Sequence, residues 1–357
     1  MINVTKTYLP SLNEYNKYLK KIWQTSYVTN HGPMVVKLEK DLTDYFNIKH
    51  LRLVSNGTIG LELAIRSLNL KGNIITTPFS YIASSASIVW QNCKPIFADI
   101  DPSSLCISPK EVEKMIDKNT QAILAVHVFG NPCDVDALSK IAKKHNLKVI
   151  YDAAHAFGVS YRGRSVLSYG DISVLSFHAT KIFHTVEGGA VVSNDPKIDK
   201  TVDHLRRFGH IGPYSYYNLG TNAKMSELHA AMGLAILPHF KNVVATRKKI
   251  VNKYDSILKN YSVIRITIDP EVKQNYSYYP IILSSQSQLK KVVKNLNTKD
   301  IFPRRYFYPS LNTLTFFKSN KCMVSEDISR RVLCLPLSYD LCDKDIEKIT
   351  NTIIKSI

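Results

Sequence analysis

The sequence has no long apolar run. Its most apolar windows, residues 121–129 and 147–151, are short, whereas a helix needs about 20 consecutive apolar residues to cross a bilayer. The N-terminal segment Met-Ile-Asn-Val-Thr-Lys-Thr-Tyr-Leu-Pro contains neither an apolar stretch nor a small-residue cleavage site of the secretory type. No membrane span is therefore predicted, and a cytoplasmic location is expected.

Cysteines are few, and none of the six belongs to a Cys-x-x-Cys pair. Disulfide frameworks and zinc sites depend on closely spaced cysteines. The cysteines of this chain are instead scattered through stretches that otherwise look buried or helical, at positions 93, 106, 133, 322, 334 and 342. Free buried thiols are therefore expected, and no metal site is predicted.

Acidic residues are also scarce. The 29 Asp and Glu against 47 Lys and Arg give a net charge of +18, and such a field would attract nucleic acid or a substrate that carries a diphosphate. The basic residues, however, occur singly or in pairs such as Lys20-Lys21 and Lys143-Lys144, never as a run of five. This pattern favours a solvated lysine-rich surface for most of the charge, and nucleic acid is not an expected partner.

The first 200 residues alternate short β-branched runs with helical patterns, which is typical of a mostly parallel sheet with crossover helices. The predicted strands are 51–54, 73–77, 95–98, 122–127, 148–152, 172–177 and 189–193, and the predicted helices are 58–68, 80–91, 109–116, 134–144 and 195–207. A chain of 357 residues accommodates one large and one smaller domain.

The pattern changes after residue 208. The Gly/Pro/Tyr-rich stretch 209–220 predicts a long loop, and 225–258 predicts a long helix that Pro238 breaks. A strand at 279–283 and helices at 287–295 and 343–354 follow. We therefore predict a large domain over 1–240 and a small α+β domain over 241–357.

Gly57 and Thr58 follow a predicted strand and open a helix, in the segment Ser-Asn-Gly-Thr-Ile-Gly at 55–60. Backbone N–H groups and a hydroxyl at such a junction can approach an anion at the positive end of the helix dipole. Plain N-capping is the alternative. The segment lacks both G-x-x-x-x-G-K-[ST] and G-x-G-x-x-G, so an NTPase or a dehydrogenase loses its main support.

Asp152 and Lys181 are the other candidate reactive groups. Asp152 ends a hydrophobic strand, at the sheet edge where ligands bind; it could hold a metal, a ribose hydroxyl or a protonated ring nitrogen, or cap a helix. Lys181 lies in a polar turn between two apolar strands. It either extends to solvent or is a candidate imine-forming nucleophile with a depressed pKa. A phosphate anchor, a carboxylate and such a lysine are together what a pyridoxal phosphate site needs.

These segments resemble, in order, the motifs of the DegT/DnrJ group of sugar aminotransferases. The matching segments are Ser-Asn-Gly-Thr, Thr-Pro-Phe-Ser-Tyr, Pro-Ile-Phe-Ala-Asp-Ile-Asp, Asp-Ala-Ala-His-Ala, Ser-Phe-His-Ala-Thr-Lys with Glu-Gly-Gly-Ala, and Asn-Ala-Lys-Met-Ser-Glu. The resemblance implies a fold-type I, aspartate aminotransferase-like α/β fold with a three-layer, mostly parallel sheet. It also implies pyridoxal 5′-phosphate as cofactor, pyridoxamine 5′-phosphate in the half-reaction, and glutamate as amino donor.

Position by position, the resemblance implies that Lys181 is the Schiff-base lysine and that Asp152 pairs with the ring nitrogen. The other cofactor-binding residues that it implies are Gly57, Thr58, Tyr81, His155, Ser176 and Asn222. Asn222 would reach the phosphate of the other subunit in a homodimer, with the loop 209–220 near the partner's active site. Some relatives carry Gln in place of His155 and Trp in place of Tyr81. Relatives with His in place of Lys181 perform dehydration, so Lys181 argues against that chemistry.

The segments 28–33 and 304–309 resemble most the enzymes that convert dTDP-4-keto-6-deoxy-D-glucose to dTDP-4-amino-4,6-dideoxy-D-glucose. Amination at C3 of a dTDP-3-keto-6-deoxy sugar is the alternative. Lys224, Arg304 and Arg305 are candidates for binding the pyrophosphate, or they form a solvated basic face. Tyr306 could stack on or hydrogen-bond to the nucleotide, or it could pack within the protein.

Overall fold

A central sheet of seven strands dominates the computed structural model, which describes residues 1–317 and 319–357. The strand order is β2 (His50–Val54), β10 (Gly189–Ser193), β9 (Ile172–Ser176), β6 (Lys148–Asp152), β5 (Thr120–Val126), β3 (Asn73–Thr76) and β4 (Lys94–Phe97). β10 runs antiparallel to both of its neighbours, and the other strands pair in parallel. The predicted mostly parallel sheet is confirmed.

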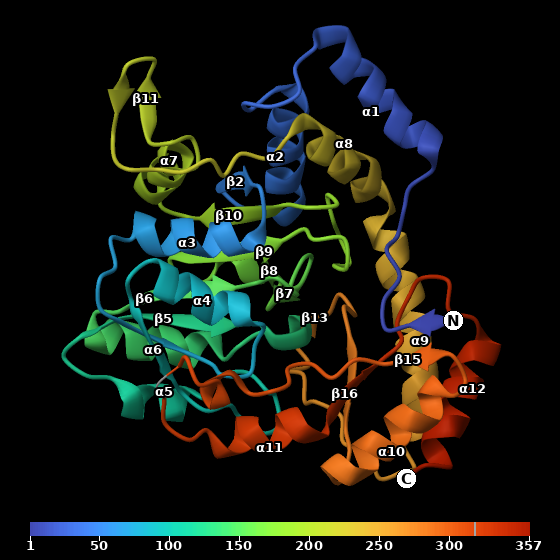
Figure 1. Ribbon diagram of the computed structural model, residues 1–357. Helices are drawn as coiled ribbons and strands as arrows, with labels where there is room; N and C mark the ends of the chain where they lie inside the picture. The colour runs from blue at the N-terminus through green and yellow to red at the C-terminus, as the bar shows by residue number, and fades with distance from the viewer. Residues whose placement is uncertain (318) are drawn as a thin grey trace.

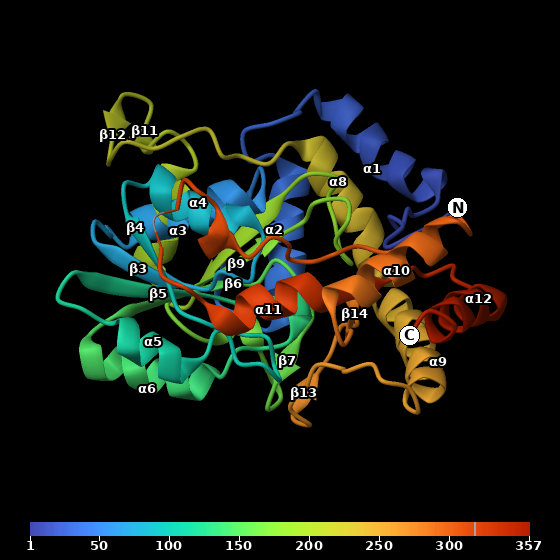
Figure 2. The same cartoon turned by 60° about the horizontal axis from the view of Figure 1, so that its bottom comes forward.

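Helices cover both faces of this sheet. On β9 and β10, Val174 and Val191 lie beside Gly60 of α3 (Gly57–Ser67), whereas the intervening Leu175 and Val192 belong to the core that contains α2 (Pro33–Phe46) and α8 (Glu227–Ile236). Successive strand residues point to opposite faces, which places the two helical layers on opposite sides. Figure 2 shows α3 next to α4 (Ile82–Trp90), and α5 (Pro109–Met115) next to α6 (Val135–His145).

Local signals set the helix starts. Asn56 accepts a hydrogen bond from the Ile59 N–H at 2.9 Å, and Asp134 accepts one from the Ala137 N–H at 2.9 Å. Such N-caps satisfy N–H groups that the first helical turn leaves free. Pro109 opens α5 and Pro196 opens α7 (Pro196–Leu205), where the missing N–H is not needed. The helices predicted from 58, 109, 134 and 195 are confirmed to within two residues.

The region after residue 208 differs from its prediction in one respect. The stretch 209–220 contains an antiparallel hairpin, β11 (His210–Gly212) with β12 (Ser215–Tyr216), which projects beyond α7 (Figure 1). Strands this short have no readable periodicity, so a loop without structure was the wrong prediction. The predicted break at Pro238 is confirmed, because a short 3-10 turn separates α8 from α9 (Phe240–Leu258).

The C-terminal third has its own hydrophobic core. β14 (Tyr279–Ile282) pairs antiparallel with β16 (Val332–Leu335), and side chains of both strands pack with α9, α10 (Gln286–Asn297) and α12 (Asp343–Ile354). The chain's first strand, β1 (Ile2–Asn3), pairs in parallel with β15 (Ile301–Phe302). The N-terminus therefore lies against the C-terminal third (Figure 1), and the domain division at residue 240 stays a prediction.

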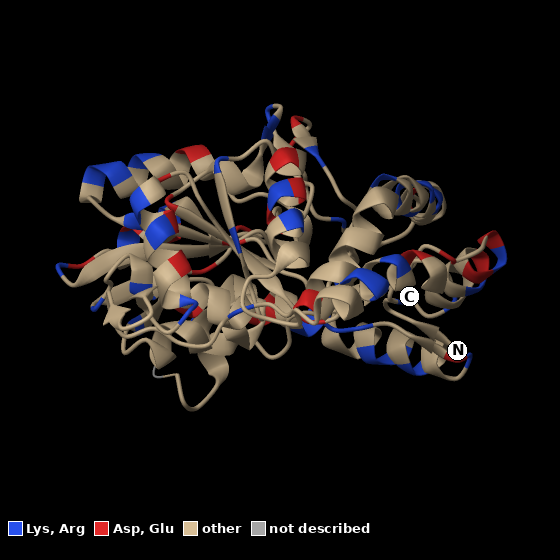
Figure 3. Cartoon of the chain, turned by 90° about the horizontal axis from the view of Figure 1, so that it is seen from above, with Lys and Arg blue, Asp and Glu red and all other residues tan. Residues whose placement is uncertain are grey.

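The surface charge is distributed rather than concentrated. Figure 3 shows blue Lys and Arg positions on many helices, with fewer red acidic positions between them. Within residues 1–317 and 319–357, no helix has the length and apolar character needed to cross a membrane. The same residues contain no His, Cys, Asp and Glu group suited to a metal ion. Their cysteines are free, and all except Cys342 are buried.

Candidate active site

A cavity of about 250 Å³ opens where β6 and β9 end and α3 begins. Most of the predicted site residues line it: Gly57, Thr58, Tyr81, Asp152, His155, Ser176, Lys181, Arg304 and Tyr306. They come from segments that are far apart in the sequence. The fold therefore brings together the predicted phosphate anchor, carboxylate and lysine.

Three predicted residues lie elsewhere. The Lys224 ammonium donates to Asn222 Oδ1 and lies 4.7 Å from the centre of the Phe208 ring. The Arg305 guanidinium lies 3.6 Å from the centre of the Tyr308 ring and lines a separate groove beside α10. Asn222, Lys224 and Arg305 are therefore not part of the cavity of their own chain.

The N-terminus of α3 forms a close-fitting cradle. Helix starts leave N–H groups without a partner inside the helix, and these groups favour an anion. A Cβ added at Gly57 would lie 3.0 Å from the Ser176 Cβ, and one added at Gly189 would lie 2.9 Å from the Gly57 nitrogen. Backbone N–H groups and the hydroxyls of Thr58 and Ser176 can thus approach a phosphate closely, as the predicted cofactor requires.

Substituting Gly189 by alanine should disturb this cradle. The new Cβ would lie 2.7 Å from the Leu175 carbonyl oxygen and 2.8 Å from the Asn56 carbonyl carbon, and these backbone atoms cannot move without shifting the loop. We expect pyridoxal phosphate to bind at least about tenfold more weakly, through lost or misaligned hydrogen bonds, as measured by absorbance titration.

Gly163→Ala is the matched control for that substitution. Gly163 has φ +73°, and an added Cβ would meet no heavy atom within 4 Å, so alanine introduces backbone strain alone. This variant should melt at a lower temperature than the unmodified protein and bind the cofactor equally well. Equal cofactor affinity in the Gly189 and Gly163 variants would contradict the prediction.

Asp152 is a buried carboxylate that is held from two sides. The Ser84 hydroxyl donates to Oδ2 at 2.7 Å and the Ala154 N–H donates to Oδ1 at 3.0 Å. Burial raises the pKa of Asp152, against these two hydrogen bonds and the nearby charge of Lys181. A protonated ring nitrogen in the cavity would offset the cost of this buried charge, so Asp152 fits the predicted partner of the pyridine nitrogen.

His155 has a defined tautomer. The Phe129 N–H donates to His155 Nδ1 at 3.2 Å, so Nε2 carries the ring proton in the neutral form. Burial and the charge of Lys181 hold the pKa of His155 well below its usual value. The imidazole also lies nearly parallel to the Phe307 ring, with centroids 5.8 Å apart. His155 can therefore act as a fixed, neutral donor.

Two residues that hold these groups were not predicted from the sequence. Ser84 binds Asp152, and buried Asn275 donates from Nδ2 to the carbonyl oxygens of His155 and Phe157 at 2.8 and 2.9 Å. The helical spacing of Ser80 and Ser84 was a readable signal for a polar helix face. No local signal marked Asn275, because it lies 120 residues after His155 in the chain.

Lys181 follows β9 in a tight turn, where its N–H donates to the His178 carbonyl oxygen at 2.8 Å. Burial lowers the pKa of Lys181 to about 8, the charge of Asp152 opposes this shift, and the charge of Arg304 adds to it. More of the amine is therefore neutral near neutral pH than in an ordinary lysine. Such an amine can act as a nucleophile and as a base.

The pH dependence of cofactor capture should report this pKa. Only the neutral amine attacks, so the rate at which cofactor-free protein captures pyridoxal phosphate should rise with pH and level off above about 8. In Arg304→Gln one cause of the shift is removed, and the inflection should move toward the ordinary 10.5. Stopped-flow absorbance at a series of pH values measures both.

Arg164→Gln is the control for that experiment. The Arg164 guanidinium lies 5.2 Å from the centre of the Tyr169 ring and does not line the cavity. Its loss should leave the inflection where it is. An Arg304 variant with the unmodified inflection would contradict the assigned electrostatic coupling to Lys181.

Comparison with known proteins finds similar sequences and structures over almost the whole chain. Residues 11–354 match the DegT/DnrJ/EryC1/StrS aminotransferase family. A dTDP-4-amino-4,6-dideoxy-D-glucose transaminase of Shigella dysenteriae is 44% identical over 99% of this chain and 98% of its own, and one of Escherichia coli is 36% identical with the same coverage. The crystal structure of DesI with its TDP-sugar product superposes with a TM-score of 0.94 at 30% identity, over 99% of this chain and 92% of that one.

Proposed function

Since the chain belongs to the DegT/DnrJ/EryC1/StrS aminotransferase family, we propose that it transfers an amino group from glutamate to C4 of dTDP-4-keto-6-deoxy-D-glucose. The product is dTDP-4-amino-4,6-dideoxy-D-glucose, which two relatives at 44% and 36% identity carry in their names. The predicted family, fold type and enzyme class, and pyridoxal phosphate as cofactor, are confirmed. The single observation that carries the substrate assignment is the end-to-end identity to the Shigella enzyme.

The residues of the cavity fit pyridoxal phosphate, which supplies an electron sink when it is bound. Gly57 and Thr58 bind the phosphate with backbone N–H groups and a hydroxyl. Asp152 holds a proton on the ring nitrogen by its negative charge, and His155 donates from Nε2 to the ring hydroxyl. Lys181 would move one proton in each half-reaction, from the Cα of the donor to the cofactor in the first and from the cofactor to the sugar carbon in the second.

The rim of the cavity provides the groups that would bind the sugar nucleotide. The Arg304 guanidinium lies 4.6 Å from the centre of the Tyr306 ring, and both side chains line the cavity. In this proposal Arg304 binds the diphosphate and, in the other half-reaction, a carboxylate of glutamate, since one cation can pair with each anion in turn. Tyr81, with 61% of its surface exposed, covers the open side of the cofactor.

The second subunit completes the site in this proposal. Asn222 and Lys224 follow the β11–β12 hairpin in the chain. Large apolar side chains in and beside this hairpin are exposed: Phe208, Ile211, Tyr214, Tyr216, Tyr217 and Leu219. Exposed apolar patches of this kind mark interaction surfaces. A homodimer in the cytoplasm would bury the hairpin and bring Asn222 to the partner's phosphate. A monomeric mass in sedimentation equilibrium would contradict this part of the proposal.

Product analysis tests the substrate assignment. Purified protein with pyridoxal phosphate and glutamate is incubated with dTDP-4-keto-6-deoxy-D-glucose or with its 3-keto isomer, and the products are read by NMR. We expect a new amine at C4 from the first substrate. Amination of the 3-keto isomer alone would replace the assignment by a C3 aminotransferase, and amination of neither would remove the dTDP-sugar assignment.

A further inference from the structure

The outer side of the edge strand β2 is hydrogen-bonded by two side chains instead of by another strand. β2 is the outermost strand of the sheet on its side, and Leu53 turns its peptide groups outward. The Leu53 N–H donates to Glu39 Oε1 at 2.9 Å, and the Leu53 carbonyl oxygen accepts from Arg206 Nη1 at 2.8 Å. The Glu39 and Arg206 side chains are themselves paired at 2.6 Å. This ion pair stands where a neighbouring strand would be.

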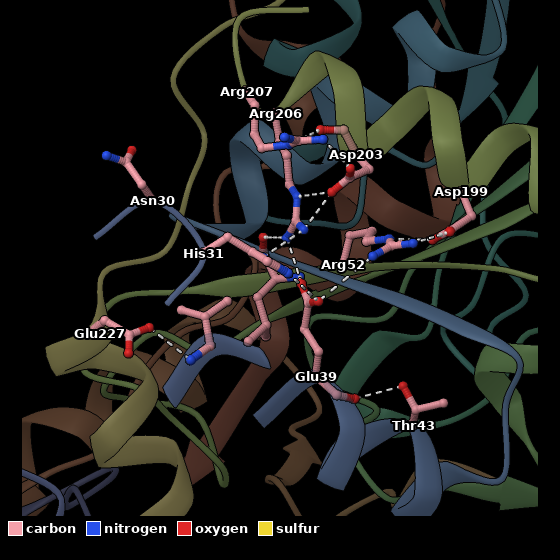
Figure 4. Close-up of polar contacts among 12 residues, drawn as sticks. Asn30, His31, Glu39, Thr43, Arg52, Asp199, Asp203, Arg206, Arg207 and Glu227 are labelled. Carbon is pink, nitrogen blue, oxygen red and sulfur yellow. Dashed lines mark hydrogen bonds and ion pairs between the residues drawn. The ribbon is translucent and has the colours of Figure 1, made fainter. Parts of the chain in front are cut away.

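Only 2% of the surface of Arg206 is exposed, and every N–H of its guanidinium donates a hydrogen bond within the protein. Nη1 donates to Glu39 and to Leu53, and Nη2 donates to His31 Nδ1 at 3.1 Å. Nε and Nη2 both donate to Asp203 Oδ1, at 3.0 and 2.6 Å. Figure 4 shows the guanidinium at the centre of this network. A lysine offers fewer donors and no planar fork, so it cannot reproduce these contacts.

The backbone of Arg206 links the same edge to a second segment. The Ala223 N–H donates to the Arg206 carbonyl oxygen at 3.0 Å, and the Ser55 N–H donates to the Ala223 carbonyl oxygen at 2.9 Å. These contacts, together with the chain from residue 53 to residue 55, form a closed loop that we call the Leu53 circuit. It contains Leu53, Arg206, Ala223 and Ser55. Ser55 directly precedes the cofactor-phosphate cradle at 56–58, which begins α3.

We propose that Arg206 is a positioning residue for the phosphate of the cofactor. It does not line the cavity, but it fixes the strand edge from which the cradle at 56–58 starts and the backbone of the 222–224 segment. This inference rests on the proposed function. Without the fork, the Arg206 backbone is no longer fixed relative to the Leu53 carbonyl oxygen, and Ala223 and Ser55 can shift with it. The N–H groups at the start of α3 then no longer converge on one point.

Cofactor binding with and without the phosphate separates this role from a purely structural one. Arg206→Lys keeps the charge and removes the fork. It should weaken pyridoxal phosphate binding by about tenfold or more, as expected for misplaced hydrogen bonds to a charged group. It should change the affinity for pyridoxal, which lacks the phosphate, by less than about twofold, because pyridoxal makes no hydrogen bonds to the cradle that could be lost. Absorbance titration gives both dissociation constants, and circular dichroism gives the melting temperature.

Arg247→Lys is the matched control. Arg247 is 3% exposed and donates from Nη1 to the Ser277 carbonyl oxygen at 3.0 Å, but it does not touch the Leu53 circuit. This variant should bind both compounds with an unchanged ratio of affinities, whatever its melting temperature. If Arg206→Lys does not fold, Glu39→Ala is measured in the same way. It removes the oxygen that accepts from both the Leu53 N–H and Arg206 Nη1, so it should show the same phosphate-specific loss.

The outcomes distinguish the inference from the function on which it rests. If the unmodified protein does not bind pyridoxal phosphate, the proposed function fails. If the unmodified protein binds it and the Arg206 variant loses both compounds equally, or neither, the positioning role is overturned. A phosphate-specific loss in Arg206→Lys, and an unchanged ratio in Arg247→Lys, supports it.

Discussion

Replacing Lys181 by alanine is expected to lower the rate of amino transfer by about 10⁴-fold, the upper range for removal of a positioned acid–base group. The amine lies in the cavity with Asp152 and His155, and its pKa of about 8 suits proton transfer near neutral pH. The variant should also lose the visible absorbance of the lysine-bound cofactor and the adduct that borohydride traps. Pyridoxamine phosphate should still bind, since its phosphate and ring contacts remain.

Lys148→Ala is the control for this experiment. Lys148 pairs with Asp171 at 3.0 Å on the surface, and half of its side chain is exposed. This variant should keep the unmodified rate and absorbance, because a surface ion pair contributes little. Retention of multiple turnovers by the Lys181 variant, or of a borohydride adduct at another lysine, would contradict the role of Lys181.

The common location of Gly57, Asp152 and Lys181 in one cavity could be predicted, because local patterns encode it. Asp152 ends a five-residue apolar strand and Gly57 opens a helix, so topology alone puts both at the carboxyl edge of a parallel sheet. Lys181 sits between two strands that pair directly in the sheet. For these residues, strand periodicity and chain direction carry enough information to bring distant segments together.

The different positions of Arg304 and Arg305 could have been predicted in part from the alternation of side chains along extended backbone. Residues that alternate along extended backbone point to opposite sides. Arg304 pairs with Cys334 of β16 in a bridge, and Arg304 and Tyr306 face the cavity while Arg305 faces α10. The sequence could have indicated that the two arginines diverge. Which one reaches the cavity depends on how the C-terminal third sits against the sheet, and the local sequence does not encode that placement.

The contacts that support the site could not be predicted from the local sequence, for a related reason. Asn275, Ser84 and Arg206 make their contacts across long stretches of chain, to the His155 carbonyl oxygen, the Asp152 carboxylate and the Leu53 carbonyl oxygen, respectively. Polar residues of these types occur throughout the sequence, and their partners are often backbone groups, which every residue has. Such contacts follow from tertiary structure and leave no spacing to read.

Asp152→Asn is expected to separate activity from stability. The amide has the same shape, and its Oδ1 can accept from the Ala154 N–H while its Nδ2 donates to the Ser84 hydroxyl oxygen. It lacks the charge that keeps the ring nitrogen protonated. Loss of a charge aimed into a dry site lowers kcat by about 10²–10³-fold. The raised pKa of Asp152 means that burial penalises its carboxylate, so the neutral amide should melt at the same or a higher temperature.

Asp171→Asn is the matched control for this substitution. Asp171 accepts from the Val149 N–H at 2.8 Å and pairs with Lys148 at 3.0 Å, outside the cavity. Its amide variant should keep both its kcat and its melting temperature, because the amide oxygen still accepts from the Val149 N–H and a surface ion pair contributes little. Melting curves and steady-state rates for both variants decide the matter. If Asp152→Asn lowers stability and activity together while Asp171→Asn lowers neither, Asp152 is a structural group and its electrostatic role is wrong.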